Sequence, residues 1–281
     1  MENLSILEQL CFSTTRIETK DANGNCYSGT GFFFNYKLEE YKTIPFIVTN
    51  KHVVKGMTTG IFRFTKVDTK GNPVYKDHFQ IQIEQFEQKC IFHPDESVDL
   101  CIFPLAWIVN IAAAQGILLF HKVFEESLIP TVEHVKNLDA VEDILMIGYP
   151  NGLWDSVNNM PLVRKGITAT DIKFDYEGRK EFIIDAACFP GSSGSPVLIC
   201  DVGGYRDKQG NLNWGCSRVF LLGILYAGPQ LTITGEIKVE TVQNIQQKIC
   251  AISHIPNNLG YVIKAERIMD FIPIIKQKFN I

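Results

Sequence analysis

Short apolar segments separated by polar turns run along most of the chain. Apolar or alternating runs of about four to eight residues, bounded by Gly, Asn, Asp or Pro, are typical of β-strands. Ten segments fit this description: "SGTGFFFNY", "IPFIVTN", "GIFRFTKV", "FQIQIEQF", "DLCIFPL", "AVEDILMIGYP", "VRKGITATDIKF", "EFIIDAACF", "SPVLICDV" and "VFLLGILYAG". The pattern predicts an all-β protein of the barrel or sandwich type rather than alternating βαβ units.

Two segments depart from this pattern. In residues 264–279, "KAERIMDFIPIIKQKF", apolar residues recur at helical spacing, which predicts a C-terminal α-helix interrupted near Pro273. The apolar stretch 104–120 is short for a membrane span and contains Asn110 and Gln115. It is predicted to be a buried helix or a strand–helix connector.

The strands fall into two groups of similar size. The simplest partition is an N-terminal β unit at 1–106, a connector at 107–137, and a C-terminal β unit with the terminal helix at 138–281. A cleft between two such units is the expected place for a functional site.

Composition narrows the functional classes. The 281 residues are 46% hydrophobic, so the chain can bury a large core. The 27 Lys and Arg residues are balanced by 31 Asp and Glu residues, which leaves no basic field for nucleic acid. The N-terminus lacks the basic and apolar regions of a secretory signal, so we expect a cytoplasmic protein that does not associate with membranes.

The eight cysteines are scattered and form no CxxC pair. Reduced, buried thiols are therefore expected rather than disulfides or a zinc site. We expect no metal and no cofactor.

The stretch "FPGSSGSPV", residues 189–197, is the strongest candidate for chemistry. Gly191 and Gly194 permit backbone angles at which successive N–H groups can converge on an anion. Ser193 lies between them, where its hydroxyl can attack a carbonyl. A tight turn between strands is the alternative interpretation of these residues.

A serine nucleophile needs a base and a group that orients the base. His52 follows the apolar run "FIVTN", after Lys51, and Asp99 precedes the run "LCIF". Either residue alone is more often structural or solvated. Their order with Ser193, His then Asp then Ser, is that of the chymotrypsin arrangement.

The blocks "IVTNKHVV", "SVDLCIFPL" and "IIDAACFPGSSGSPVL" resemble the His, Asp and Ser blocks of trypsin-like serine peptidases. "MIGYPNGLWD" and "VRKGITAT" add a likeness to the bacterial HtrA and V8-like branch, without a PDZ domain. The resemblance implies two packed six-stranded antiparallel β-barrels with the triad of His52, Asp99 and Ser193 between them. It also implies an oxyanion hole formed by the N–H groups of Gly191 and Ser193, with Ser192 as an auxiliary donor.

The same resemblance locates a specificity pocket. Its base corresponds to Ala187 and its wall to Leu225, Tyr226 and Ala227, which favours a small or medium apolar substrate side chain. An insertion at 229–247 adjoins this wall.

These observations predict a serine endopeptidase that cleaves protein or peptide substrates through an acyl-enzyme. Narrow specificity or a regulatory protein partner is expected, because an unrestrained cytoplasmic protease would be harmful. The alternative from another class is a catalytically silent peptide-binding or scaffold module that uses the cleft. A third reading is a triad that hydrolyses esters or cleaves only its own chain.

Overall fold

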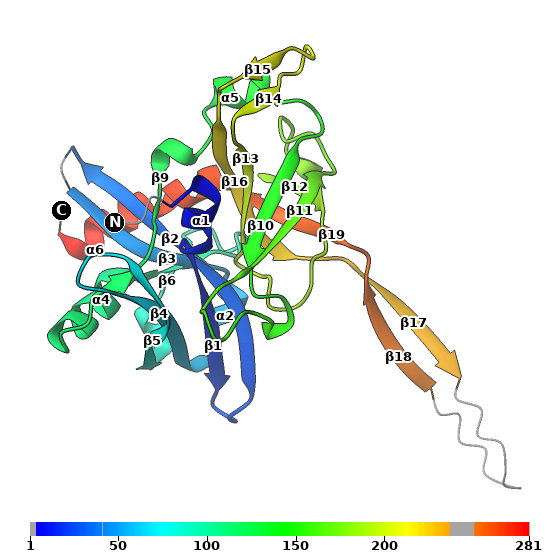
Figure 1. Ribbon diagram of the computed structural model, residues 1–281. Coiled ribbons are helices and arrows are strands. Elements are labelled where there is room, and N and C mark those ends of the chain that lie inside the picture. Colours follow the sequence, from blue (N-terminus) through cyan, green and yellow to red (C-terminus); the bar gives the residue numbers. More distant parts are fainter. Residues whose placement is uncertain (1–3, 41, 237–249, 281) are drawn as a thin grey trace, which may run out of the picture.

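A computed structural model describes residues 4–40, 42–236 and 250–280, and it contains two β units that lie side by side (Figure 1). The N-terminal unit is a nine-stranded sheet of order β5-β4-β1-β2-β3-β7-β6, with β8 paired to β4 and β9 paired to β2. Its strands are β1 (Thr14–Asp21), β2 (Cys26–Glu39), β3 (Lys42–Thr49), β4 (Met57–Val67), β5 (Pro73–Glu84), β6 (Ile91–Phe92), β7 (Cys101–Pro104), β8 (Leu119–Phe120) and β9 (Phe124–Glu125).

The C-terminal unit is a closed barrel of six antiparallel strands in the order β10-β11-β12-β19-β16-β13. Its strands are β10 (Asp143–Gly148), β11 (Leu162–Thr168), β12 (Glu181–Asp185), β13 (Pro196–Asp201), β16 (Arg218–Ala227) and β19 (Leu259–Lys264). The predicted all-β, chymotrypsin-like architecture with a C-terminal helix is confirmed. The N-terminal unit differs in detail, because it has nine strands where six were expected.

Alternation along β2 explains how one strand serves two cores. Phe33 is buried inside the N-terminal sheet, among the residues of β1, β3 and β4. Phe32 and Phe34 point to the other face and join a second core, which contains Leu198 and Ile224 of the C-terminal barrel. Successive side chains of a strand point to opposite faces, so β2 links the two units.

The segment 107–137 does more than connect the units, because it supplies β8 and β9 to the N-terminal sheet. It also continues α4 (Leu105–Ala114), whose Leu105, Ile108 and Ala112 are buried. The predicted buried helix is thus present. Among the described residues, no helix is long and apolar enough to cross a membrane.

The remaining helices are short. They are α1 (Ile6–Cys11), α2 (Lys51–Val54), α3 (Phe86–Lys89), α5 (Val132–Asn137) and the 3-10 turns η1 (Glu126–Leu128), η2 (Pro150–Gly152) and η3 (Tyr176–Gly178).

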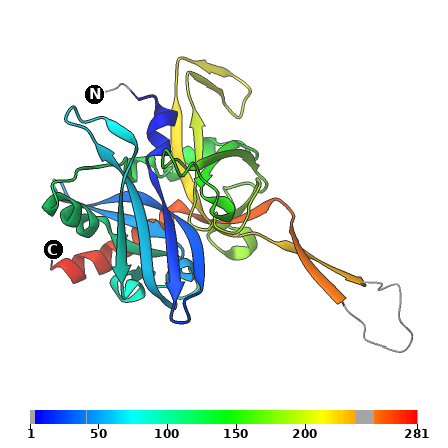
Figure 2. The same cartoon turned by 60° about the horizontal axis from the view of Figure 1, so that its bottom comes forward.

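The C-terminal helix follows the last barrel strand, contacts β16 with its first part and ends against β2 of the N-terminal unit (Figures 1 and 2). It consists of a 3-10 segment, η4 (Ala265–Phe271), and an α-helix, α6 (Ile272–Phe279). The change occurs beside Pro273, which lies in the first turn of α6. Proline is tolerated there because that N–H has no partner within the helix, so the predicted interruption is confirmed.

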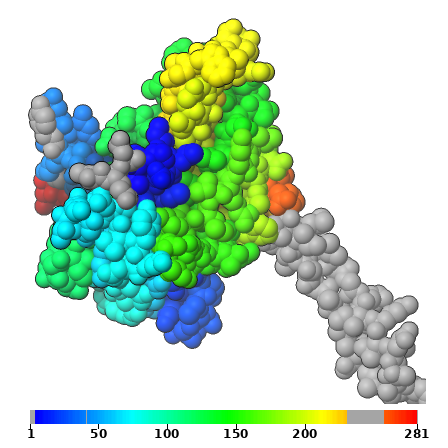
Figure 3. Space-filling model, viewed as in Figure 1, coloured from blue at the N-terminus to red at the C-terminus, as the bar shows by residue number. Residues whose placement is uncertain are grey.

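Two hairpins project from the C-terminal barrel. One, formed by β14 (Gly204–Arg206) and β15 (Leu212–Trp214), stands out from the surface in Figure 3. The other, formed by β17 (Gln230–Glu236) and β18 (Cys250–Pro256), extends away from the barrel (Figure 2). The insertion expected at 229–247 therefore begins as a strand, and its residues 237–247 lie outside the described part of the chain.

Candidate active site

His52 and Asp99 are brought together by the ends of two neighbouring strands. His52 lies on the single turn α2 directly after β3, and Asp99 lies just before β7, which pairs with β3. The His52 ring nitrogen Nδ1 is 2.5 Å from Asp99 Oδ2, and the His52 backbone N–H donates to Asp99 Oδ1 at 3.0 Å. A carboxylate only accepts, so this contact places the proton on Nδ1 and leaves Nε2 unprotonated in the neutral ring.

Asn50 holds the position of Asp99. Its Nδ2 donates to the Asp99 carbonyl at 2.8 Å, and Asn50 is fully buried. The Asp99 side chain is 24% exposed and the His52 side chain 49% exposed. The pair therefore lies at the surface, where a substrate can reach the free face of the imidazole.

The loop that carries Ser193 requires its two glycines. Gly191 and Gly194 have φ of 88° and 89°, values that side-chain-bearing residues rarely adopt. A Cβ on Gly194 would lie 1.9 Å from the Thr30 carbonyl oxygen, and a Cβ on Gly191 would lie 2.6 Å from the Tyr149 carbonyl oxygen. The loop is therefore a tight turn packed against neighbouring backbone, as the glycine pattern indicated.

Two backbone donors of this loop are free. The N–H groups of Gly191 and Ser193 donate to no group within residues 4–40, 42–236 and 250–280. The N–H of Ser192 donates to the Phe189 carbonyl at 3.0 Å. The N–H of Ser192, expected as an auxiliary donor, is thus already used by the turn.

The peptide between Pro190 and Gly191 has a fixed direction. Its carbonyl oxygen accepts a hydrogen bond from the Asn151 N–H at 2.5 Å. No cis peptide occurs in the described chain, and the C=O and N–H of a trans peptide point in opposite directions. The Gly191 N–H consequently faces away from Asn151.

The Ser193 hydroxyl contacts the C-terminal barrel rather than the imidazole. Its Oγ lies 3.4 Å from the Tyr226 carbonyl oxygen, and this is the hydrogen bond that the hydroxyl makes in the described structure. At that length the bond is weak. Rotation of the hydroxyl away from it therefore costs little.

A cavity of about 140 Å³ opens directly beside Ser193. Leu225 and Ala227 line it, as expected. Ala187 and Tyr226 do not: the Tyr226 hydroxyl instead donates to Glu181 Oε2 at 2.9 Å. The cavity is also lined by four residues that were not predicted, Cys188, Phe189, Pro190 and Gly228.

The cavity wall is apolar, and Arg164 contacts one of its residues, Phe189. Cys188 is buried, and burial raises the pKa of its thiol to about 12, so the thiol stays protonated. Arg164 donates to the Ala187 carbonyl at 2.7 Å, and its guanidinium carbon lies 4.9 Å from the centre of the Phe189 ring. Its charge is thus directed at a backbone carbonyl and an aromatic face.

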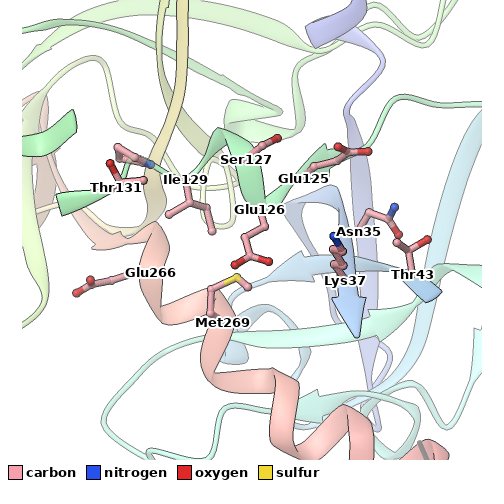
Figure 4. A pocket seen from close by; sticks show the side chains of 11 residues that line it. Asn35, Lys37, Thr43, Glu125, Glu126, Ser127, Ile129, Thr131, Glu266 and Met269 are labelled. Atoms are coloured by element: carbon pink, nitrogen blue, oxygen red, sulfur yellow. The ribbon is translucent and has the colours of Figure 1, made fainter. Parts of the chain in front are cut away.

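A larger hollow of about 610 Å³ lies away from Ser193, between the ends of β2 and β3, the connector and η4. Figure 4 shows the side chains of Lys37, Glu126 and Met269 around it. It contains none of the residues predicted to carry chemistry. No cluster of three or more metal-ligating side chains occurs among the residues that the structure describes.

Residues 29–203 match the family model of the trypsin-like peptidase domain. No curated protein sequence matches the chain. Solved structures with a similar fold include the active form of the Rv3671c protease from M. tuberculosis, with 16% identity, coverage of 92% of this chain and 78% of that one, and a TM-score of 0.42. Another is a catalytically inactive tobacco etch virus protease in complex with substrate, with 14% identity, coverage of 95% and 84%, and a TM-score of 0.46.

Proposed function

Since the chain belongs to the trypsin-like peptidase family and is a serine protease, we propose that Ser193, His52 and Asp99 are its catalytic triad. The observation that carries this proposal is the pair of free N–H groups on Gly191 and Ser193, in a loop that also presents the serine hydroxyl. Such donors stabilise an oxyanion, which a simple turn does not need.

Each residue has one step in the proposed reaction. Asp99 holds the Nδ1–H of His52, so Nε2 accepts the Ser193 proton as Oγ attacks the substrate carbonyl. The N–H groups of Gly191 and Ser193 bind the negative oxygen of the tetrahedral intermediate. His52 then gives the proton to the leaving amine, an acyl-enzyme remains, and water releases it by the same steps.

One rearrangement precedes the attack. The Ser193 hydroxyl must leave the Tyr226 carbonyl and turn toward His52. That carbonyl is then free to accept a hydrogen bond from the backbone of an extended substrate. Substrate binding and activation of the nucleophile are therefore coupled in this proposal.

The cavity beside Ser193 supports a preference for a small or medium apolar side chain before the cleaved bond. Its walls are Leu225, Ala227 and the protonated Cys188, and none of its lining residues is charged. A charged substrate side chain would lose its hydration there without gaining a partner. Peptide libraries should therefore be cleaved after Ala, Val or similar residues rather than after Lys, Arg or Glu.

Labelling with a fluorophosphonate probe tests the triad. We expect a covalent adduct on Ser193 in the native protein, no adduct in Ser193→Ala, and a rate at least 100-fold lower in His52→Ala. Ser192→Ala is the matched control, because the Ser192 hydroxyl is buried and makes no hydrogen bond in the described structure. An unlabelled native protein, or equal labelling of Ser193→Ala, would refute the proposal.

We also propose a reducing compartment, the cytoplasm, and a regulatory protein partner. Support for the compartment comes from seven of the eight cysteines, which are free thiols: Cys11, Cys26, Cys90, Cys101, Cys188, Cys200 and Cys216. The partner is supported by the need to restrain a protease there. Peptide cleavage measured with and without cell lysate tests for such a partner, and equal rates would argue against one.

A further inference from the structure

We propose that Trp154 is a positioning residue for the oxyanion hole, a role that rests on the proposed function of Gly191 and Ser193. Trp154 lies in the loop after β10, and Arg16 and Arg63 of the N-terminal unit contact its ring.

The Asn151 N–H donates to the Pro190 carbonyl at 2.5 Å. This contact keeps the Gly191 N–H facing away from Asn151, because the C=O and N–H of a trans peptide point in opposite directions. Gly191 has a φ of 88° and no side chain, so this peptide can rotate if the Asn151 contact is lost. The orientation of one oxyanion donor thus depends on the position of Asn151.

Asn151 has φ 50° and ψ 26°, in the left-handed region, and Gly152 follows with a φ of 67°. Asparagine and glycine adopt this region more readily than other residues. Hydrogen bonds from the Gly152 N–H to the Tyr149 carbonyl at 3.1 Å and from the Leu153 N–H to the Pro150 carbonyl at 2.7 Å close the turn. These bonds set the shape of the turn, whereas its position on the molecule depends on the contacts of the flanking residues.

The anchor of this loop on the N-terminal unit is Trp154. The guanidinium carbons of Arg16 on β1 and Arg63 on β4 lie 5.6 Å and 4.9 Å from the centre of the Trp154 ring. These are cation–π distances. Arg16 also packs on the loop backbone, because a Cβ on Gly152 would lie 3.2 Å from its Nη2.

The anchor has two further supports. Tyr149, at the start of the loop, packs edge-on against Trp154 with ring centres 6.3 Å apart. Asn159, at the far end, donates to the Thr65 hydroxyl of β4 at 3.3 Å. In Figure 3 the green surface around residue 150 lies against the cyan surface around residue 70.

Other contacts hold neighbouring groups of the nucleophile loop, since the Ser192 N–H donates to the Phe189 carbonyl and the Thr30 hydroxyl donates to the Gly191 carbonyl. Among the described residues, the Pro190 carbonyl itself accepts from Asn151. Docking of Trp154 on the N-terminal unit is thereby coupled to assembly of the oxyanion hole on the C-terminal barrel.

The test measures hydrolysis of the p-nitrophenyl ester of N-acetylvaline by the full chain. We expect Trp154→Ala to lower kcat by about 10- to 100-fold with KM changed less than about 3-fold, because the lost donor acts mainly in the transition state. Trp154→Phe should recover most of kcat. Binding of a peptide boronic acid should weaken in parallel with kcat.

Trp107→Ala is the matched control, since Trp107 makes a similar contact, 4.2 Å from Lys89 Nζ, on α4 of the N-terminal unit. It should leave kcat within about 2-fold. If Trp154→Ala does not fold, Arg63→Gln serves instead, with an expected loss of about 3- to 10-fold in kcat.

The outcomes separate the two proposals. A wild-type protein that hydrolyses no ester and takes up no fluorophosphonate contradicts the triad. An active wild type whose folded Trp154→Ala and Arg63→Gln variants keep full kcat contradicts the positioning role alone. Equal loss in Trp107→Ala and Trp154→Ala also contradicts it, because the effect would then be general destabilisation.

Discussion

Thr30 links the two β units through three hydrogen bonds. Its hydroxyl donates to the Gly191 carbonyl at 3.0 Å and accepts from the Tyr149 N–H at 3.2 Å. Its own N–H donates to the Ser193 carbonyl at 2.8 Å. Thr30 belongs to β2, so one buried residue of the N-terminal sheet, through its side chain and its backbone, holds the nucleophile loop of the C-terminal barrel.

Thr30→Val tests this role. The substitution keeps the shape but leaves a buried carbonyl and a buried N–H without their partner, so the free energy of unfolding should fall by about 1–3 kcal/mol in urea titrations. Thr19→Val is the control, because Thr19 is also buried and its hydroxyl has no partner in the described structure. It should be neutral or slightly stabilising. Equal destabilisation by both changes would show that the Thr30 hydrogen bonds contribute nothing.

His93 gives the molecule a pH-sensitive contact. Its ring is fully buried between the N-terminal sheet and η4, near Arg267 and Asp270. Desolvation, aided by the Arg267 charge, lowers the pKa of His93 below its usual 6.5. The unfolded chain therefore binds the proton at a higher pH than the folded chain does.

The contribution of neutral His93 to the free energy of unfolding should consequently be fully present above about pH 6.5. It should fall as the pH drops from there toward the lowered pKa of folded His93. Urea unfolding between pH 7.5 and 5.5 measures this slope. In His93→Gln the slope should be smaller, because the residue no longer titrates. An unchanged slope would assign the effect to other groups, such as His121, whose pKa burial also lowers.

Some site residues could be predicted from the sequence, and others could not. The structure brings His52 next to Asp99 and gives Gly191 and Gly194 the positive φ expected of them. It places the Tyr226 side chain outside the pocket. The ladder between β16 and β19 shifts register between Leu225 and Ala227, and a bulge of this kind redirects side chains in a way that spacing alone does not reveal.

At the scale of elements, the apolar pattern located strands well when one face is strongly apolar. All ten predicted segments coincide with strands of the structure. Strand β1, "TTRIETKD", was missed because charged residues interrupt it, although it pairs with both β2 and β4. The neighbouring strands of the sheet supply the apolar environment that β1 lacks in its own sequence. Stabilisation by residues distant in the sequence cannot be predicted from the β1 residues alone.

The C-terminal helix should stabilise the whole protein through one buried face. Ile275 is fully buried in the core that contains Phe34 of the N-terminal sheet. Ile275→Ala should lower the free energy of unfolding by about 2–5 kcal/mol, because it leaves a cavity there. Gln277→Ala, on the exposed side of the same helix, should change it by less than about 0.5 kcal/mol. Similar values for the two variants in urea titrations would contradict this packing.

At the scale of the molecule, the largest core belongs to neither unit alone. It joins Phe32 and Phe46 of the N-terminal sheet, Leu198 and Leu221 of the barrel, and the buried face of the terminal helix. The partition into two units describes how the chain is connected. It does not describe how apolar surface is buried, since separating the units would expose this shared core to water.

The shared core predicts that the two units unfold together. Native-state hydrogen exchange should give the slowest amides of β3 and of β13 the same opening free energy, within about 1 kcal/mol, because both require global unfolding. Ile275→Ala should lower both values by the same amount, even though α6 packs on the N-terminal unit. If the β3 amides alone respond, or if they open at a clearly lower free energy than those of β13, the units are independent. In that case the contacts of Thr30 and Trp154 would be the main link between the halves of the active site.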